Sequence, residues 1–213
     1  MNVDWAFVAT ILAVLVPSVI LHEVSHGVVA NIFGDDTAKR AGRLTLNPIS
    51  HIDPFGTVIL PIILSLSGFG AFGFAKPVPV TVTKLRNPRQ HSLYVSLAGP
   101  AVNIVLAVAA AIVLRTFFTI DTVGGRFIED SVVADVLVNF GIINVILAAF
   151  NLIPLPPLDG SAMVERLLPA AWWPTWLKIR RYSMGGLILI VLLVPGLLSR
   201  VFTPAIELWA TLL

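Results

Sequence analysis

Five apolar segments, separated by short polar loops, dominate the pattern of hydrophobic and polar positions along the chain. Four of them have the length or the uniform hydropathy of membrane spans: residues 5–33, 93–118, 132–153 and 184–202. A helix of about 20 apolar residues crosses the hydrocarbon core of a bilayer. We expect the last of these segments to kink at Pro195-Gly196. The pattern therefore predicts an all-α polytopic membrane protein with about four transmembrane helices.

The second apolar segment, residues 55–75, differs because proline, serine and glycine interrupt it. The loops on both sides of it are basic, and basic loops tend to stay on the cytoplasmic side of a membrane. A segment with both ends on one side must enter the membrane and return. We therefore expect a re-entrant or broken segment, whose irregular backbone is covered by protein or lines a cavity. An ordinary span is the alternative.

The charges of the loops predict how the spans are oriented. Lysine and arginine occupy the loops at 35–51 and 76–89 and the stretch at 178–181, whereas the loop at 121–135 is acidic overall. The positive loops place these three stretches inside and both chain ends outside. Three tryptophans beside the last basic stretch are expected to anchor it at the interface: Trp172, Trp173 and Trp176. The N-terminal segment lacks a basic start and a cleavage site, so we expect it to be a retained first span.

Composition agrees with a membrane protein, since 57% of the 213 residues are hydrophobic and 12% are charged, with a mean hydropathy of +0.92. Soluble domains usually carry about 25% charged residues. We expect one membrane domain over residues 1–213, without a sizeable soluble appendage. The net charge of +2 is too small to indicate a nucleic-acid partner. Cysteine is absent, so any metal must be held by His, Asp or Glu.

The first span carries polar residues that are expensive to bury in a bilayer. His22-Glu23-Val24-Ser25-His26 matches the pattern H-E-x-x-H. Residues i and i+4 share one face of a helix, so His22 and His26 can bind one metal ion. Glu23 lies beside them, placed to hold a metal-bound water rather than the metal. The alternatives are hydrogen-bonded core histidines or a polar cavity without metal. Because ionisable residues inside spans are functional by default, we favour the metal.

A catalytic zinc site needs a third protein ligand beside an open position. The sequence offers five candidates: His51, Asp53, His91, Asp159 and Glu165. His22 lies about 26 Å along the first helix from its outer end, in the inner part of the bilayer. Asp159 follows the fourth segment on that same inner side, in the stretch Leu155-Pro-Pro-Leu-Asp-Gly160. Depth therefore favours Asp159 as the third ligand.

These two motifs together resemble the site-2 protease family of intramembrane zinc metalloproteases. H-E-x-x-H in a first span is followed here by N-x-x-P-x-P-P-x-D-G at 151–160, and AGPAVN at 98–103 and FAKPVPV at 74–80 also resemble small prokaryotic members. The resemblance implies one zinc ion held by His22, His26 and Asp159, with Glu23 as general base. It also implies an active site that faces the cytoplasmic side, without the PDZ or regulatory domain of larger members.

Two further features have open interpretations. Asn103 follows Gly99-Pro100 inside an apolar segment, and the resemblance favours a catalytic donor that positions substrate or stabilises an oxyanion. An interhelical hydrogen bond is the alternative. We expect Asn151 to cap its helix, with orientation of the Asp159 loop as the alternative. Asn139 and Asn144 are expected to serve helix packing. The run Lys76-Pro-Val-Pro-Val80 must be extended, and we interpret it as a connector, with an edge for an unwound substrate strand as the alternative.

The sequence thus predicts an endopeptidase that cuts peptide bonds within or near transmembrane helices. Its expected partners are a transmembrane protein substrate and the lipid bilayer. A membrane metal-ion transporter or carrier that uses the same His and Asp ligands is the alternative, but transport predicts ligands at several depths. An inactive relative is a third hypothesis, which the intact Glu23 opposes.

Overall fold

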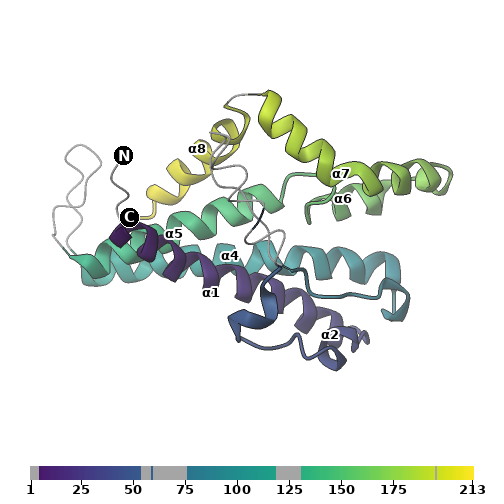
Figure 1. Cartoon of the computed structure of the whole chain (residues 1–213), viewed down its shortest axis with the longest axis horizontal. Helices are drawn as coiled ribbons and strands as arrows, with labels where there is room; N and C mark the ends of the chain where they lie inside the picture. The colour runs from purple at the N-terminus through teal and green to yellow at the C-terminus, as the bar shows by residue number, and fades with distance from the viewer. Residues whose placement is uncertain (1–4, 54–58, 60–75, 119–130, 195) are drawn as a thin grey trace.

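The computed structural model describes residues 5–53, 59, 76–118, 131–194 and 196–213 (Figure 1). These residues form seven α-helices and no strand, which confirms the predicted all-α class for this part of the chain. The helices are α1 (Trp5–Ile32), α2 (Thr37–Arg40), α4 (Pro88–Phe117), α5 (Val132–Asn151), α6 (Ser161–Leu167), α7 (Trp173–Leu193) and α8 (Leu197–Ala210). Short 3-10 helices are η1 (Pro48–His51), η3 (Val82–Lys84) and η4 (Ala170–Trp172). The predicted re-entrant segment lies outside the described residues, apart from Ile59.

Three long helices form the centre of the molecule. In Figure 1, α1 lies alongside α4 and α5, and these two pack on each other. Their contact is made of small buried side chains, namely Ala107, Ala110, Ala111 and Ala134. Small residues let helices approach closely, which matters in lipid because water does not drive helices together there. Trp209 of α8 completes this cluster and donates its Nε1–H to the Ala107 carbonyl oxygen at 2.7 Å.

Polar side chains set where two of these helices begin. The Asn87 side chain accepts a hydrogen bond from Gln90 N, and Pro88 occupies the first turn, so α4 begins at Pro88 rather than at residue 93 as predicted. Ser131 caps α5 by accepting from Ala134 N, at the predicted start of the fourth apolar segment. Helix α4 therefore includes the predicted third apolar segment and also the last residues of the basic loop that precedes it.

Three helices of the described residues are long and apolar enough to span a membrane: Val8–Ile32, Pro88–Phe117 and Val132–Asn151. Their outward faces are apolar. On α4, for example, Val105 is 66% exposed and Ile112 is 60% exposed. Such continuous apolar surface suits contact with lipid rather than with water. These helices therefore agree with the integral membrane protein that the composition predicts.

The last predicted span, residues 184–202, is broken into two helices near Gly196, where a kink is expected from the sequence. α7 ends at Leu193 and α8 begins at Leu197, because Gly196 adopts a left-handed conformation with φ of 76° that ends a helical run. α7 also starts earlier than predicted, so it includes the basic residues Lys178, Arg180 and Arg181. Three candidate spans lie among the described residues, and α7 and α8 are not among them; the prediction of about four spans for the whole chain stays a prediction.

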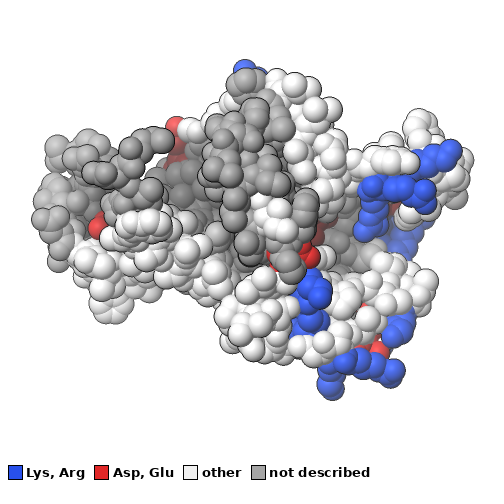
Figure 2. Space-filling model, viewed as in Figure 1, with Lys and Arg blue, Asp and Glu red and all other residues white. Residues whose placement is uncertain are grey.

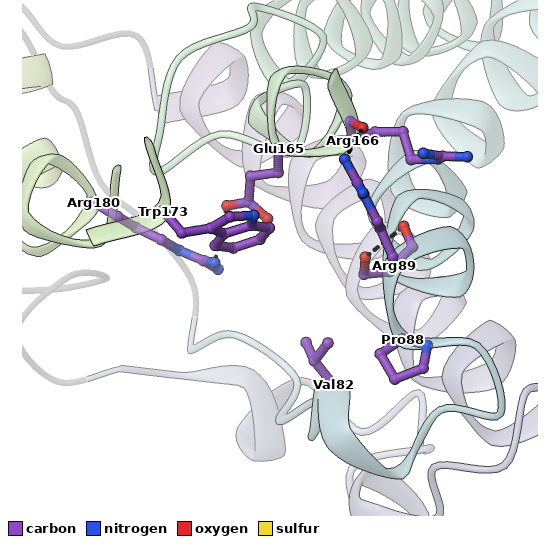
Figure 3. A pocket seen from close by; sticks show the side chains of 8 residues that line it. Val82, Pro88, Arg89, Glu165, Arg166, Trp173 and Arg180 are labelled. Carbon is purple, nitrogen blue, oxygen red and sulfur yellow. Dashed lines mark hydrogen bonds and ion pairs between the residues drawn. The ribbon is translucent and has the colours of Figure 1, made fainter. Parts of the chain in front are cut away.

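Lysine and arginine side chains gather at one end of the molecule, where α1 ends and α4 and α7 begin (Figure 2). A cavity of about 350 Å³ lies at this end, between α4, α6 and α7 (Figure 3). Arg89 of α4 crosses it and donates through Nη2 to the carbonyl oxygens of Arg166 and Leu168, at 3.0 and 3.1 Å. These bonds tie the chain between α6 and α7 to the start of α4.

The packing of α8 predicts the effect of a single methyl group. A Cβ added at Gly141 would lie 2.1 Å from Cζ2 of the buried Trp209 ring. We expect Gly141→Ala to lower the thermal unfolding temperature in detergent, with a loss of about 1–3 kcal/mol, because overpacking forces the indole out of place. Gly185→Ala is the matched control, since a Cβ there meets no atom within 4 Å. Equal stability of the Gly141 variant and wild type would show that α8 does not pack here.

Candidate metal centre

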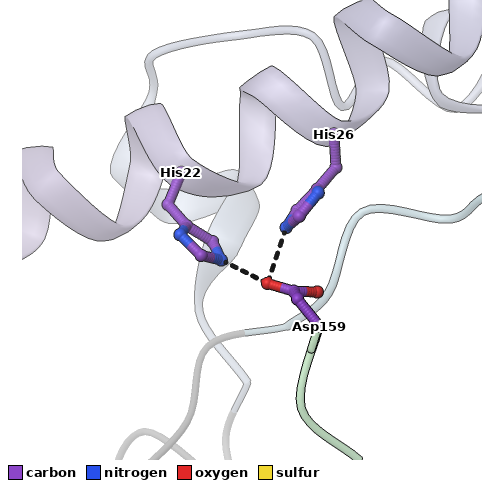
Figure 4. Close-up of side chains that lie close together, drawn as sticks. All are labelled: His22, His26 and Asp159. Carbon is purple, nitrogen blue, oxygen red and sulfur yellow. Dashed lines mark ion pairs between the residues drawn. The ribbon is translucent and has the colours of Figure 1, made fainter. Parts of the chain in front are cut away.

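Helix α1 presents His22 and His26 on one face, one turn apart (Figure 4). Their rings lie edge to face with centroids 4.8 Å apart, and the residues are 6% and 8% exposed. Asp159 reaches them from beyond α5: its Oδ2 lies 3.1 Å from His22 Nε2 and 3.3 Å from His26 Nε2. The three side chains that the sequence favoured as ligands are therefore brought together.

The return of the chain after α5 places Asp159. Gly160 N donates to the Asn151 carbonyl oxygen at 2.6 Å, so the loop closes onto the last turn of α5. A Cβ at Gly160 would lie 2.4 Å from the carbonyl oxygen of Leu152. Only glycine allows so close an approach of two backbones. The motif glycine thereby holds its neighbouring carboxylate beside α1.

Hydrogen bonds to the far nitrogen of each ring determine which nitrogen carries the proton. His26 Nδ1 donates to the carbonyl oxygen of Val95 at 2.7 Å, and His22 Nδ1 donates to Oδ1 of Asn103 at 2.5 Å. A neutral imidazole has one N–H and one lone pair. With both Nδ1 atoms protonated, both Nε2 atoms direct a bare lone pair toward Asp159.

This arrangement fits a zinc ion. Two nitrogen lone pairs and a carboxylate oxygen converge within 4.8 Å, and the buried Asp159 Oδ2 has no hydrogen-bond partner among the described residues. Three lone pairs facing one another repel unless a cation lies between them. Two imidazoles and one carboxylate form a ligand set that is common for catalytic zinc, which keeps a fourth position open.

Glu23 lies next to this centre on α1, and its carboxylate is held from outside the helix. Oε2 accepts a hydrogen bond from the backbone N–H of Val78 at 2.8 Å. Because Pro77 and Pro79 have no N–H group, Val78 N–H is the donor that the run between them offers. The extended connector therefore fixes the orientation of the predicted general base, although it carries no ligand of its own.

Further bonds keep that connector alongside α1. Lys76 N donates to the His51 carbonyl oxygen at 3.0 Å, and Thr81 N donates to Asp35 Oδ2 at 2.6 Å. Burial opposes the charge on Asp35, but hydrogen bonds from Thr37 and Thr81 outweigh it and lower the pKa of this carboxyl group. The connector interpretation of residues 76–80 agrees with these contacts, while its use as a substrate edge stays a prediction.

The other candidate ligands lie elsewhere. His51 Nε2 donates to the carbonyl oxygen of Thr45, and His91 stacks on Phe33 with ring centroids 4.0 Å apart. Glu165 lines the cavity at the basic end (Figure 3). Its Oε1 accepts hydrogen bonds from Trp176 Nε1 and Arg180 Nη1. Asp53 is not a member of the His22, His26 and Asp159 group. Of the five candidates, Asp159 is the one in the described residues that lies with the two histidines, and its role as a zinc ligand stays a prediction.

Asn103 makes the interhelical hydrogen bonds that were the alternative to a catalytic role. It is fully buried, with its oxygen on His22 and its Nδ2 donating to Oδ1 of Asn144 at 2.7 Å. Its predicted contact with substrate stays a prediction. Asn151 donates to the Leu147 carbonyl oxygen in its own helix, as expected of a structural residue.

Sequence reasoning missed two residues of this centre. Val78 bonds to Glu23 through its backbone, which no side-chain pattern reveals, although its position between two prolines is a usable signal. Gly99 stands out in the sequence only as part of a motif. A Cβ there would lie 2.5 Å from both His22 Cε1 and His26 Nε2, so α4 packs directly on the two rings.

Comparisons with known proteins point to one family. The model of Peptidase family M50 matches residues 10–132 and 117–194. YwhC of Bacillus subtilis is 37% identical over 91% of this chain and 84% of its own length, and Rip2 of Mycolicibacterium smegmatis is 33% identical over 87% and 66%. Both are named as zinc metalloproteases. No solved structure matches the chain. These names and the ligand group confirm the predicted zinc cofactor.

The contact at Gly99 predicts how zinc binding responds to one added methyl group. We expect Gly99→Ala to weaken zinc binding by about 10-fold to 100-fold, because the Cβ must displace the rings that carry the metal. Zinc affinity is measured by chelator competition on purified protein in detergent. Gly186→Ala in α7 is the control, as its Cβ meets no atom within 4 Å. Unchanged affinity in the Gly99 variant would contradict this geometry.

Proposed function

Because the chain belongs to Peptidase family M50, the site-2 protease family, and is a zinc metalloprotease, we propose that it cuts peptide bonds within or near transmembrane helices. The observation that carries the proposal is that Asp159, from the turn after α5, meets His22 and His26 on α1, a helix long enough to span a membrane. A hydrolytic site at this depth on a membrane-spanning helix is expected to act on a substrate that itself lies in the membrane. The action is regulated intramembrane proteolysis by an endopeptidase.

In this proposal, His22, His26 and Asp159 would hold one zinc ion. Zinc bound there supplies Lewis-acid chemistry, polarising the scissile carbonyl group and making water a stronger acid. Glu23 accepts the proton of the attacking water and then delivers it to the leaving amine, as a general base and acid. The hydrogen bond from Val78 N–H fixes the orientation of the Glu23 carboxylate for this proton transfer.

A transmembrane substrate must unwind before it can be cut. Its peptide carbonyls are hydrogen-bonded within its own helix, so they are hidden from a nucleophile until the helix opens locally. Helix-breaking residues near the cut would lower that cost. We expect residues 76–80, which run beside Glu23, and the loop at 35–53 to border the path of the unwound segment.

The active site faces the cytoplasmic side in this proposal. The basic side chains gather at the end of the bundle where α1 ends and α4 begins (Figure 2). His22 and His26 lie in the half of α1 nearer that end. Since basic clusters flank spans on the cytoplasmic side, this end is assigned to the cytoplasm.

Metal transport is the weaker alternative. A carrier would be expected to place coordinating residues at several depths along a path. Within the described ranges, one group of metal-binding side chains is present, and it lies at a single depth. No contact in the described residues favours transport over hydrolysis.

A substitution at Glu23 tests the proposal. We expect Glu23→Gln to retain zinc and to lose cleavage of a model transmembrane substrate by at least about 100-fold, because an amide cannot take the proton of water. Both are measured on purified protein in liposomes, as zinc content per chain and as cleavage products on gels. Cleavage at the wild-type rate by the glutamine variant would reject the endopeptidase.

Asp159→Ala provides the contrast to that variant. It removes a proposed ligand and not the proposed base, so it should lower zinc affinity as well as cleavage. Normal zinc occupancy in the Asp159 variant would remove Asp159 from the ligand set while leaving the proteolytic activity open to the Glu23 test. The two variants thus separate the binding of the metal from the transfer of the proton.

A further inference from the structure

A chain of buried hydrogen bonds leads away from His22 through three helices. Asn103 of α4 accepts from His22, Asn144 of α5 accepts from Asn103 at 2.7 Å, and Ser18 of α1 accepts from Asn144 at 2.9 Å. Asn103, Asn144 and Ser18 are all 0% exposed. Polar groups buried this deeply in an apolar bundle are costly unless every bond is made. The proposed mechanism uses Glu23 and the ligands, but gives no role to Asn144 or Ser18.

The two histidines differ in what fixes their protons. His26 Nδ1 faces a backbone carbonyl oxygen, that of Val95, which can only accept. His22 Nδ1 faces a side-chain amide, which can present either its oxygen or its NH₂ group. If the Asn103 amide were reversed, His22 would carry its proton on Nε2, and no lone pair would face Asp159. The orientation of Asn103 therefore decides whether His22 can bind metal.

Two backbone carbonyl groups determine that orientation. Ser18 Oγ donates to the Val14 carbonyl oxygen at 2.7 Å, so its lone pair is left to accept from Asn144. The Asn144 Nδ2 group also donates to the Phe140 carbonyl oxygen at 2.8 Å. Since both of its partners require a donor, the nitrogen of Asn144 must face them.

The consequence passes along the chain of bonds one group at a time. With its nitrogen committed to Phe140 and Ser18, Asn144 turns its oxygen to Asn103 and accepts from Nδ2. Asn103 must then present its oxygen to His22, whose proton is held on Nδ1. Every bond has one permitted direction, and reversing any member would bring two acceptors or two donors face to face.

We propose that Asn144 and Ser18 are positioning residues, which act through Asn103 to hold His22 in the tautomer whose Nε2 lone pair faces the metal. This proposal rests on the proposed role of His22 as a zinc ligand. The three residues come from the three candidate spans, so the tautomer is correct only when α1, α4 and α5 are assembled together. Metal binding is thereby coupled to the packing of the bundle.

The test removes the amide of Asn144. We expect Asn144→Leu to weaken zinc binding by about 10-fold to 100-fold, the usual effect of losing a group that supports a metal ligand. The matched control is Asn139→Leu. Asn139 makes the same kind of bond within α5, to the Asp135 carbonyl oxygen at 2.7 Å, and it is not part of this chain of bonds. Its replacement should leave zinc affinity unchanged.

A spectroscopic measurement distinguishes positioning from packing. The chain has four histidines, and ¹⁵N NMR of metal-free protein with labelled imidazoles, at alkaline pH, gives the tautomer of each. In wild type we expect His22 and His26 both as Nδ1–H. In Asn144→Leu the His22 signals should shift toward a mixture with Nε2–H, while His26, held by Val95, stays unchanged as an internal reference. Asn144→Ala replaces the leucine variant if the latter does not purify folded.

Rescue completes the design. A carboxylate accepts on both oxygens, so Asn103→Asp in the Asn144→Leu background should return His22 to Nδ1–H and zinc affinity toward the wild-type value. Unchanged affinity in Asn144→Leu, or zinc loss with an unchanged His22 tautomer, would overturn the proposal. Neither measurement involves a substrate, so failure here is distinct from failure of the Glu23 test of proteolysis.

Discussion

The convergence of two imidazole lone pairs and one carboxylate inside an apolar bundle is the constraint from which the rest of this molecule follows. Unpaired polar groups are expensive in a bilayer. Asp159 Oδ2 lies 3.1 Å from His22 Nε2 and 3.3 Å from His26 Nε2, and three acceptors so close together are still less favourable unless a cation joins them. Supporting residues must therefore bring the groups together against their own repulsion. Gly99 lets α4 pack against the two rings, Gly160 lets the turn after α5 close, and Asn103 accepts a hydrogen bond from His22.

The supporting contacts come from segments distant in sequence, so the geometry of the proposed zinc site depends on the folding of the whole bundle. α1 supplies both histidines, α4 packs on their rings at Gly99, and the turn after α5 supplies the carboxylate. The connector at 76–80 holds Glu23 through one backbone N–H. Small residues at 107, 110, 111 and 134 allow the close approach of α4 and α5 that this geometry needs. The proposed zinc site thus depends on the assembled helices rather than on one motif.

The sequence predicted the features that depend on the spacing of residues along a helix and on their depth in the membrane. H-E-x-x-H places His22 and His26 on one face of any helix, and depth along the span selected Asp159. Features that depend on contact between distant segments were missed or misjudged. Val78 acts through its backbone, and Asn144 was assigned to packing because nothing in its neighbours reveals a bond to Asn103. The break at Gly196 was predicted only as a kink, because the hydropathy of a segment does not show that one of its residues adopts a left-handed conformation.

X-ray absorption at the zinc edge of the purified protein tests the central claim most directly. We predict a first shell of nitrogen and oxygen, with ligands at about 2.0–2.2 Å, and outer-shell scattering from two imidazoles. The only protein oxygen donor in that shell should disappear when Asp159 is replaced by alanine. A shell with three imidazoles, which would draw in His51 or His91, or a spectrum unaffected by that replacement, would contradict a site built from His22, His26 and Asp159.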